Sequence, residues 1–116
     1  MINKLDDPDS QVRATAARAM GRLGSERTVR TLLERLDEEE VQEVQAELLR
    51  ALGQIGDPGA VQAIEKRAVG SFLKRPPVEV RVAAYRALAL IGTPRAKQLL
   101  EDAADDKDPE VRTAVR

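Results

Sequence analysis

The chain has 116 residues with no cysteine, histidine or tryptophan, and its 19 basic and 20 acidic residues leave a net charge of −1. Without histidine or cysteine, the sequence excludes disulfides, thiolate nucleophiles, Ser-His or Cys-His catalytic pairs, and metal sites built on either residue. The balanced charge argues against nucleic acid as a partner, because proteins that displace counterions from a phosphate backbone carry a clear basic excess.

Membrane association is not expected either. No apolar run approaches the roughly 18 residues that span a bilayer, and residues 1–5 are too short and too polar for a signal peptide. The cytoplasm is therefore the default location.

One apolar pattern recurs at residues 12–23, 44–55 and 80–91 and begins again at Val111. In each copy the apolar residues fall at i, i+4, i+7, i+8 and i+11, which places them in one stripe along an α-helix. A second, shorter apolar pattern follows each copy, so each repeat is predicted to be a helical hairpin. The predicted helices, in chain order, are 9–23, 28–36, 40–55, 58–73, 77–91, 94–104 and 109–116.

The predicted helices have start and stop signals. A capping side chain stands before a proline, a residue suited to the first helical turn, at Asp7-Pro8, Asp57-Pro58, Thr93-Pro94 and Asp108-Pro109. The first helix of each hairpin ends at a glycine that suits the left-handed C′ conformation. These glycines are Gly24, Gly56 and Gly92.

Hairpins of this kind gain a continuous core by stacking on one another. The sequence therefore predicts an all-α fold, an α-α superhelix or solenoid of about three and a half helical hairpins, as a single domain over residues 1–116. The repeats are placed at about 6–36, 37–75 and 76–106, with a partial repeat at 107–116. Because both ends resemble incomplete hairpins, we expect a piece of a longer array, or ends covered by another molecule, including a second copy.

Small residues on the first helix of each hairpin are expected to let neighbouring helices approach closely. A bulky side chain at Ala19 or Ala51 is predicted to overpack the contact and to cost on the order of 1 to 3 kcal/mol.

The repeat motifs resemble HEAT-like, armadillo-like repeats of the type found in phycobilisome lyase subunits and many bacterial proteins. The motifs are the Val-Arg pairs at 12–13, 80–81 and 111–112, the Ala-Leu-Gly-x-Ile-Gly-Asp-Pro run at 51–58, and the Asp-Pro-Glu-Val-Arg run at 108–112. The resemblance covers nearly the whole chain. It implies the solenoid fold and leaves the function open, since the family includes scaffolds, lyase subunits and enzymes.

The resemblance also implies a ligand-facing, concave side formed by the second helices. Exposed positions there form rows across the repeats, and one row alternates in charge sign. Such a row either satisfies itself through lateral ion pairs, each about 0 to 1 kcal/mol at a surface, or contacts a partner through polar groups. The candidate residues are Arg30, Gln62 and Lys97 in one row and Glu34, Lys66 and Glu101 in the next.

The second repeat departs from the pattern. Gln45 stands where the arginine of the Val-Arg pair is expected, and 36 positions separate Val44 from Val80, against 32 between Val12 and Val44. The extra residues fall at 70–75. Insertions in one repeat of a solenoid are frequent contact sites.

The insertion lies in a basic segment, 66–86, one repeat after an acidic segment, 37–49. One interpretation is a docking patch for an acidic partner or a phosphate backbone, with Phe72 as apolar anchor. In the other, the two segments neutralise one another across the stack, and Phe72 and Tyr85 are core residues. The candidate residues at the insertion are Phe72, Lys74 and Arg75.

The arginines of the Val-Arg pairs, Arg13, Arg81 and Arg112, are expected to be structural, reaching carboxylates or helix-end carbonyls of the next repeat. The alternative is a ladder that binds an anion. Carboxylates at 37–40 and 102–106 are expected to be solvated connections rather than metal sites, because neither has the spacing of a calcium loop.

No nucleophile has a partner in this sequence. We therefore hypothesise a non-catalytic protein-protein interaction scaffold, not an enzyme and without a cofactor, whose partner is another protein. One alternative is a subunit of a phycobilin lyase that positions a linear tetrapyrrole, and another is a nucleic-acid-binding HEAT-like module that uses residues 66–86.

Overall fold

The computed structural model describes residues 4–71 and 73–116. Its helices are α1 (Ser10–Leu23), α2 (Glu26–Glu38), α3 (Gln42–Ile55), α4 (Val61–Val69), α5 (Val78–Ile91), α6 (Pro94–Asp102) and α7 (Pro109–Ala114). Three short 3-10 helices are η1 (Lys4–Asp6), η2 (Pro58–Ala60) and η3 (Ala103–Asp105). The predicted all-α class is confirmed, and the described residues form no strand.

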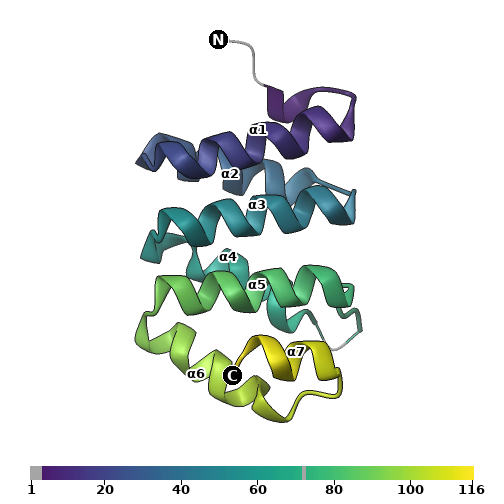
Figure 1. The fold of residues 1–116 in the computed structure, drawn as a ribbon, viewed down its shortest axis with the longest axis vertical. Helices are drawn as coiled ribbons and strands as arrows, with labels where there is room; N and C mark the ends of the chain where they lie inside the picture. The colour runs from purple at the N-terminus through teal and green to yellow at the C-terminus, as the bar shows by residue number, and fades with distance from the viewer. Residues whose placement is uncertain (1–3, 72) are drawn as a thin grey trace.

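Consecutive helices pair into the hairpins α1–α2, α3–α4 and α5–α6, and α7 follows the last of them. Figure 1 shows α1, α3 and α5 one below another as a first-helix layer, with α2 and α4 behind them in a second-helix layer. The stack measures 43 × 25 × 22 Å, and the chain runs from one end of its long axis toward the other. This repeated stacking is the α-solenoid that the sequence predicted.

Side-chain caps begin several helices. Asp9, Asp57 and Thr93 each accept a hydrogen bond from a backbone N–H two or three residues further on, which satisfies one of the free donors of the first turn. The predicted cap at Asp7 is wrong, because Asp7 accepts the N–H of Asp9 and Asp9 is the N-cap of α1. Asp108 occupies the N-cap position of α7 with Pro109 in the first turn, as predicted, but its carboxylate binds an arginine and makes no cap hydrogen bond.

The predicted stops are confirmed: Gly24, Gly56 and Gly92 have φ values of 65°, 79° and 69°. The predicted helix 58–73 is wrong at its end. α4 ends at Val69, because Gly70 has a φ of 72°, and the described residues among 70–77, which include two prolines, form no helix. The insertion of the second repeat is therefore a loop and not a lengthened helix.

The core is the stripe that the repeat pattern predicted, but only in the inner repeats. On α3 and α5 the stripe residues are buried or nearly so, whereas on α1 Ala19 is exposed and Leu23 is 72% exposed. The physical reason is that α3 packs on α1 and α5 packs on α3, while among the described residues only η1, with its buried Leu5, lies on the outer side of α1.

The predicted close approach of the first helices is confirmed. A Cβ built on Gly53 lies 2.6 Å from the Cα of Ala87, and one built on Gly21 lies 3.0 Å from the Cα of Ala51. Ala51 is buried, so a bulky side chain there would overpack the contact between the first helices. Ala19 is exposed, so the prediction that a bulky side chain at this residue overpacks the contact is wrong.

Candidate protein-binding site

The candidate residues of the second-helix layer are all exposed. The predicted lateral ion pairs within the row of Glu34, Lys66 and Glu101 are absent from the described residues. The ion pair that does join two second helices connects Arg95 of α6 to Glu65 of α4, with an Nη2–Oε2 distance of 2.7 Å. The row is therefore not self-satisfied, and its charges face solvent.

Two of the Val-Arg arginines, Arg13 and Arg81, connect successive repeats. We call the contact between α1–α2 and α3–α4 the first junction, that between α3–α4 and α5–α6 the second, and that between α5–α6 and α7 the third. At the first junction, Arg13 binds both carboxylate oxygens of Glu39, at 2.8 and 3.1 Å. Glu39 is only 4% exposed, and Arg35 of α2 lies 3.4 Å from the same carboxylate.

Burial alone would raise the pKa of Glu39. The hydrogen bonds from Arg13 and from the backbone N–H of Val41, with the charges of Arg13 and Arg35, outweigh that effect and lower the pKa below its usual value. This carboxylate therefore stays ionised and joins the two repeats.

The third junction repeats the arrangement. Arg81, 1% exposed, binds both carboxylate oxygens of Asp106 and one of Asp108, and its Nε donates to the carbonyl of Ala68 at 2.9 Å. The hydrogen bond from Arg81, with lesser help from the N–H of Asp108 and the charge of Arg75, lowers the pKa of Asp106 to about 2, against the opposing effect of burial. The structural interpretation is confirmed for Arg13 and Arg81. Arg112 instead donates to the carbonyls of Asp106 and Lys107, which directly precede its own helix, so its predicted contact with a next repeat is not seen among the described residues.

The second junction lacks this ion pair. Glu39, Arg75 and Asp106 each stand three residues before a first helix, and Arg13, Gln45 and Arg81 are the matching fourth residues of first helices. At the second junction both partners are changed, because the arginine is Gln45 and the acid is Arg75. Gln45 donates to the carbonyl of Glu39 in its own repeat at 2.6 Å, and Arg75 turns to Asp106, 3.1 Å away.

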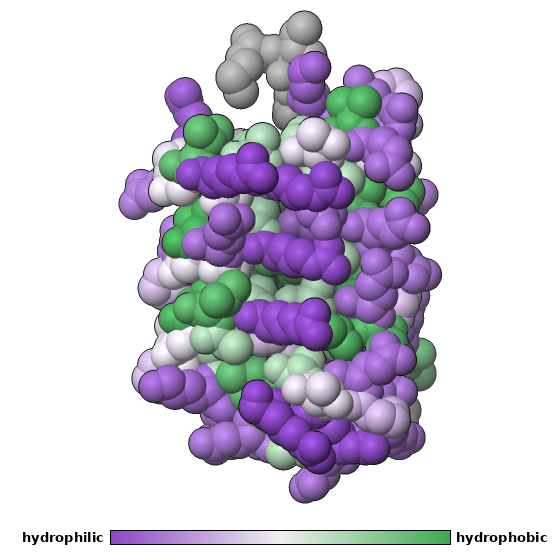
Figure 2. Space-filling model, viewed as in Figure 1, coloured by the Kyte–Doolittle hydropathy of each residue, from purple (hydrophilic) through white to green (hydrophobic). Residues whose placement is uncertain are grey.

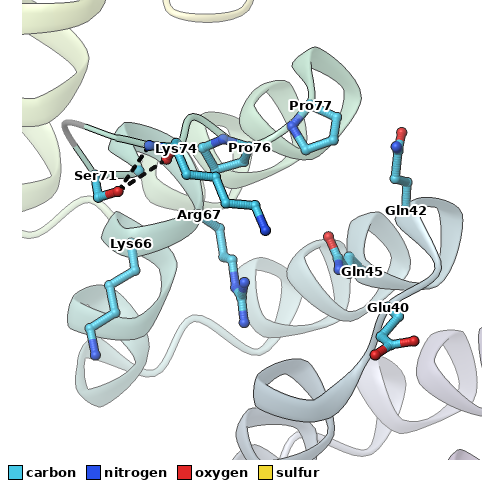
Figure 3. A pocket seen from close by; sticks show the side chains of 10 residues that line it. Glu40, Gln42, Gln45, Lys66, Arg67, Ser71, Lys74, Pro76 and Pro77 are labelled. Carbon is cyan, nitrogen blue, oxygen red and sulfur yellow. Dashed lines mark hydrogen bonds between the residues drawn. The ribbon is translucent and has the colours of Figure 1, made fainter.

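A cavity of about 490 Å³ opens at this junction, and we call it the second-junction groove. Figure 3 shows Lys74 and Arg67 extending into the space between the repeats, toward Gln45, with Glu40 across from them and Lys66 at the outer edge. Arg67 and Gln45 are half-buried, and the two lysines are exposed. The lining residues are Glu40, Gln42, Gln45, Lys66, Arg67, Gly70, Ser71, Lys74, Pro76 and Pro77.

The insertion forms one wall of the groove. The backbone groups of Ser71 and Lys74 exchange hydrogen bonds of 2.9 and 3.3 Å, which close a tight turn. Leu73, in this turn, is 90% exposed. Of the candidates at the insertion, Lys74 lines the groove, Arg75 belongs to the third junction, and Phe72 lies outside the described residues. Tyr85 is buried, as predicted.

The acidic and basic segments do not neutralise one another, so that interpretation is wrong. In the described residues, acids of 37–49 pair with arginines of α1, α2 and α3, and the bases Arg75 and Arg81 pair with Asp106 and Asp108. Lys66, Arg67 and Lys74 have no carboxylate within ion-pair distance among residues 4–71 and 73–116. The groove therefore keeps its positive charge.

A second arginine ladder, which was not among the predicted candidates, lies on the first-helix layer. Arg18, Arg50 and Arg86 each follow the first valine of their repeat by six residues and are exposed, and Figure 2 shows long hydrophilic side chains crossing this face in rows. Extending the repeat register would have found them. Glu47 pairs with both Arg18 and Arg50, so the ladder is partly neutralised.

Metal binding and membrane insertion find no support in the described residues. There, no three His, Cys, Asp or Glu side chains gather closely enough to hold a metal ion. None of the helices formed by this part of the chain combines the length and apolar character required to cross a membrane.

The stacked hairpins define an α-solenoid repeat protein. The chain belongs to the HEAT-repeat family, since the family model described as HEAT repeats matches residues 1–71 and again residues 66–116. A comparison with curated protein sequences finds no significant match.

Among solved structures, the chain is similar to one in the complex of CpcE and CpcF of phycocyanin lyase from Nostoc sp. PCC7120. The TM-score is 0.73 and the sequence identity is 25%, and the match covers 94% of this chain and 68% of that one. The predicted resemblance to lyase-type HEAT-like repeats is therefore confirmed. This chain is a HEAT-repeat protein that shares its fold with a chain of that complex.

Proposed function

We propose that this chain is a non-catalytic module that binds another protein, with the second-junction groove and the adjoining second-helix face as its binding surface. The observation that carries the proposal is the positive charge of Lys66, Arg67 and Lys74 around a cavity between two repeats, since within the described part of the chain none of the three pairs with a carboxylate. Neighbouring charges elsewhere at the junctions are paired within the chain, so the groove has binding capacity that the fold does not use.

The second-helix face extends this surface. Arg30, Gln62, Lys97 and their neighbours are exposed, and an interface here would be polar with few apolar anchors. Leu73, beside the groove, supplies one such anchor. The similarity to a chain that was solved as a complex of two proteins supports a protein as the partner.

Site-specific photo-crosslinking tests the proposal. A photoreactive amino acid replaces Leu73 in the full chain, or Leu90 on the first-helix layer as a control, because both side chains are exposed. In extracts of cells that contain the protein naturally, we expect one protein adduct at position 73 and none at 90. Mass spectrometry then identifies the partner, and binding is repeated with the purified proteins.

Charge reversal then assigns the surface. The double variant Lys66→Glu with Lys74→Glu should remove the adduct, and Arg30→Glu with Lys97→Glu tests whether the second-helix face takes part. No adduct at position 73, or an adduct that neither double variant weakens, would reject the proposal. Salt-sensitive binding of duplex DNA that Lys66→Glu and Lys74→Glu abolish would favour nucleic acid instead.

A second candidate function rests on the similarity to a chain of phycocyanin lyase. In this alternative the chain is a lyase subunit that holds a linear tetrapyrrole for attachment to a carrier protein. Its residues would position the pigment, since the chain has neither cysteine nor histidine. A red-shifted bilin absorption band on titration with the chain would support this function, and an unchanged spectrum would exclude it.

A further inference from the structure

We infer that the second-junction groove is a carboxylate-binding site, filled by a glutamate or aspartate from an acidic segment of the partner protein. The inference rests on the proposed function and names the chemistry that the partner must present. It starts from the two other junctions, where the chain itself provides the carboxylate.

The first junction shows what such a site holds. The carboxylate of Glu39 lies between Arg13 of the first helix and Arg35 of the second helix of the preceding repeat. The matching residues of the next repeat, 32 positions later, are Gln45 and Arg67. Both line the groove, so two of the groups that surround a carboxylate at the first junction have counterparts here. The carboxylate itself has none, since Arg75 occupies the matching position.

The groups in the groove retain donors for a carboxylate. Arg67 donates from Nη2 to the carbonyl of Leu36 at 2.9 Å, and a guanidinium has further N–H groups. Gln45 uses its side-chain nitrogen toward Glu39, and an amide nitrogen carries two hydrogens. The ammonium group of Lys74 is a third donor, and the Lys74 side chain extends into the same space (Figure 3).

Partial burial makes these donors effective. Arg67 and Gln45 are half-buried, and an ion pair removed from bulk water is screened less than one on an open surface. The loop 70–75 walls one side of the groove and fixes Lys74 through the turn closed by Ser71.

The charge pattern favours a carboxylate over a phosphate chain. The cationic groups are confined to one cavity, whereas a nucleic acid backbone needs cations spaced along its length. The carboxylate of Glu40 also lies on the rim, and it repels a doubly charged phosphate group more strongly than a singly charged carboxylate. Leu73, in the turn between Ser71 and Lys74, is exposed and available to contact an apolar residue next to the partner's acid.

A single substitution should fill the groove with a carboxylate of the chain itself. Arg75→Glu places a carboxylate at the position that Glu39 and Asp106 occupy in the other junctions, where it can reach Gln45 and Arg67. We expect it to abolish binding of a short fluorescein-labelled peptide rich in glutamate, measured by fluorescence anisotropy. Arg86→Glu makes the same charge change at an exposed residue that does not line the groove and should alter binding less than about twofold.

A second substitution should improve the site. Gln45→Arg restores the guanidinium that Arg13 provides at the first junction, and we expect peptide affinity to rise about 5- to 10-fold, because hydrogen bonds between charged groups are stronger than those from an amide. The double variant Gln45→Arg with Arg75→Glu should rebuild the intramolecular pair, bind no peptide and unfold at a higher urea concentration than Arg75→Glu alone.

The controls separate the outcomes. A matched peptide with glutamine in place of glutamate should not bind. Equal binding to both peptides, or equal loss with Arg75→Glu and Arg86→Glu, would overturn the carboxylate site, as would tighter binding of a phosphoserine peptide or duplex DNA. If the natural partner still crosslinks at position 73 to the Arg75→Glu variant, the protein-binding function stands and only the carboxylate site falls.

Discussion

Asp106→Asn is predicted to be among the most damaging polar substitutions in the chain. The carboxylate accepts hydrogen bonds from Arg81, Arg75 and the N–H of Asp108, and an amide would turn N–H groups toward the guanidinium of Arg81. The lowering of the pKa from 3.8 to about 2 corresponds to about 2 kcal/mol in favour of the ionised form. Because Asp108 and the carbonyl of Ala68 still bind Arg81, we expect a loss of about 2 to 3 kcal/mol, below the range of about 3 to 5 for a buried charge left unpaired.

Urea unfolding followed by circular dichroism measures this loss as a drop of roughly 1 M in the midpoint. Glu65→Gln is the matched control, since it makes the same carboxylate-to-amide change in the surface pair with Arg95, where side-chain exposures of 30% and 55% predict a loss under about 1 kcal/mol. Equal midpoints for the two variants would refute the argument that burial sets the strength of the pair.

Three other outcomes are expected. The pKa of Asp106 is lowered by folding, so its stabilisation is complete above about pH 4 and is lost as the pH falls toward about 2; urea midpoints across this range should fall less in Asp106→Asn than in the unchanged chain. Gly53→Ala should destabilise the protein by about 1 to 3 kcal/mol by thermal unfolding, because the new Cβ lies 2.6 Å from the Cα of Ala87, and a stabilised variant would contradict the packing. Arg13→Gln places at the first junction the residue type that Gln45 provides at the second. It should lower the free energy of unfolding in urea by about 2 to 3 kcal/mol, because buried Glu39 loses its bidentate partner. A loss below about 1 kcal/mol would show that Arg35 alone is enough to stabilise the Glu39 carboxylate.

The fold was predictable because its signals are local and repeated. The stripe spacing gives a helix, a glycine ends the first helix of each hairpin, and the agreement of several copies gives the stack. The wrong predictions concern residues whose conformation or burial is not determined by the apolar pattern alone. The predicted helix ran on to residue 73, but Gly70 takes a positive φ and ends α4 before it. Leu23 fits the stripe and is exposed, because burial depends on what lies against a helix and not on its own sequence.

The site was predictable only in part. Gln45 and the insertion marked the second repeat as unusual, and Lys66 and Lys74 line the groove. The sequence did not reveal that Arg75 stands at the position that Glu39 and Asp106 hold in the other junctions. The carboxylate that binds a Val-Arg arginine lies 25 or 26 residues further along the chain, in another repeat, and only the structure shows the contact. For the same reason, the sequence left open whether segments 37–49 and 66–86 pair with each other, and contacts in the structure show that they do not.

The packing at the second junction decides what an occupant of the groove would do to the whole stack. Arg81 of α5 donates to the carbonyl of Ala68 in α4, and Arg95 of α6 pairs with Glu65 of α4, so the repeats on either side are already joined. The groove is lined by residues of both repeats, so it exists only in the folded stack. An occupant therefore binds the folded chain and not the unfolded one, and its binding energy adds to the resistance of the entire solenoid to unfolding.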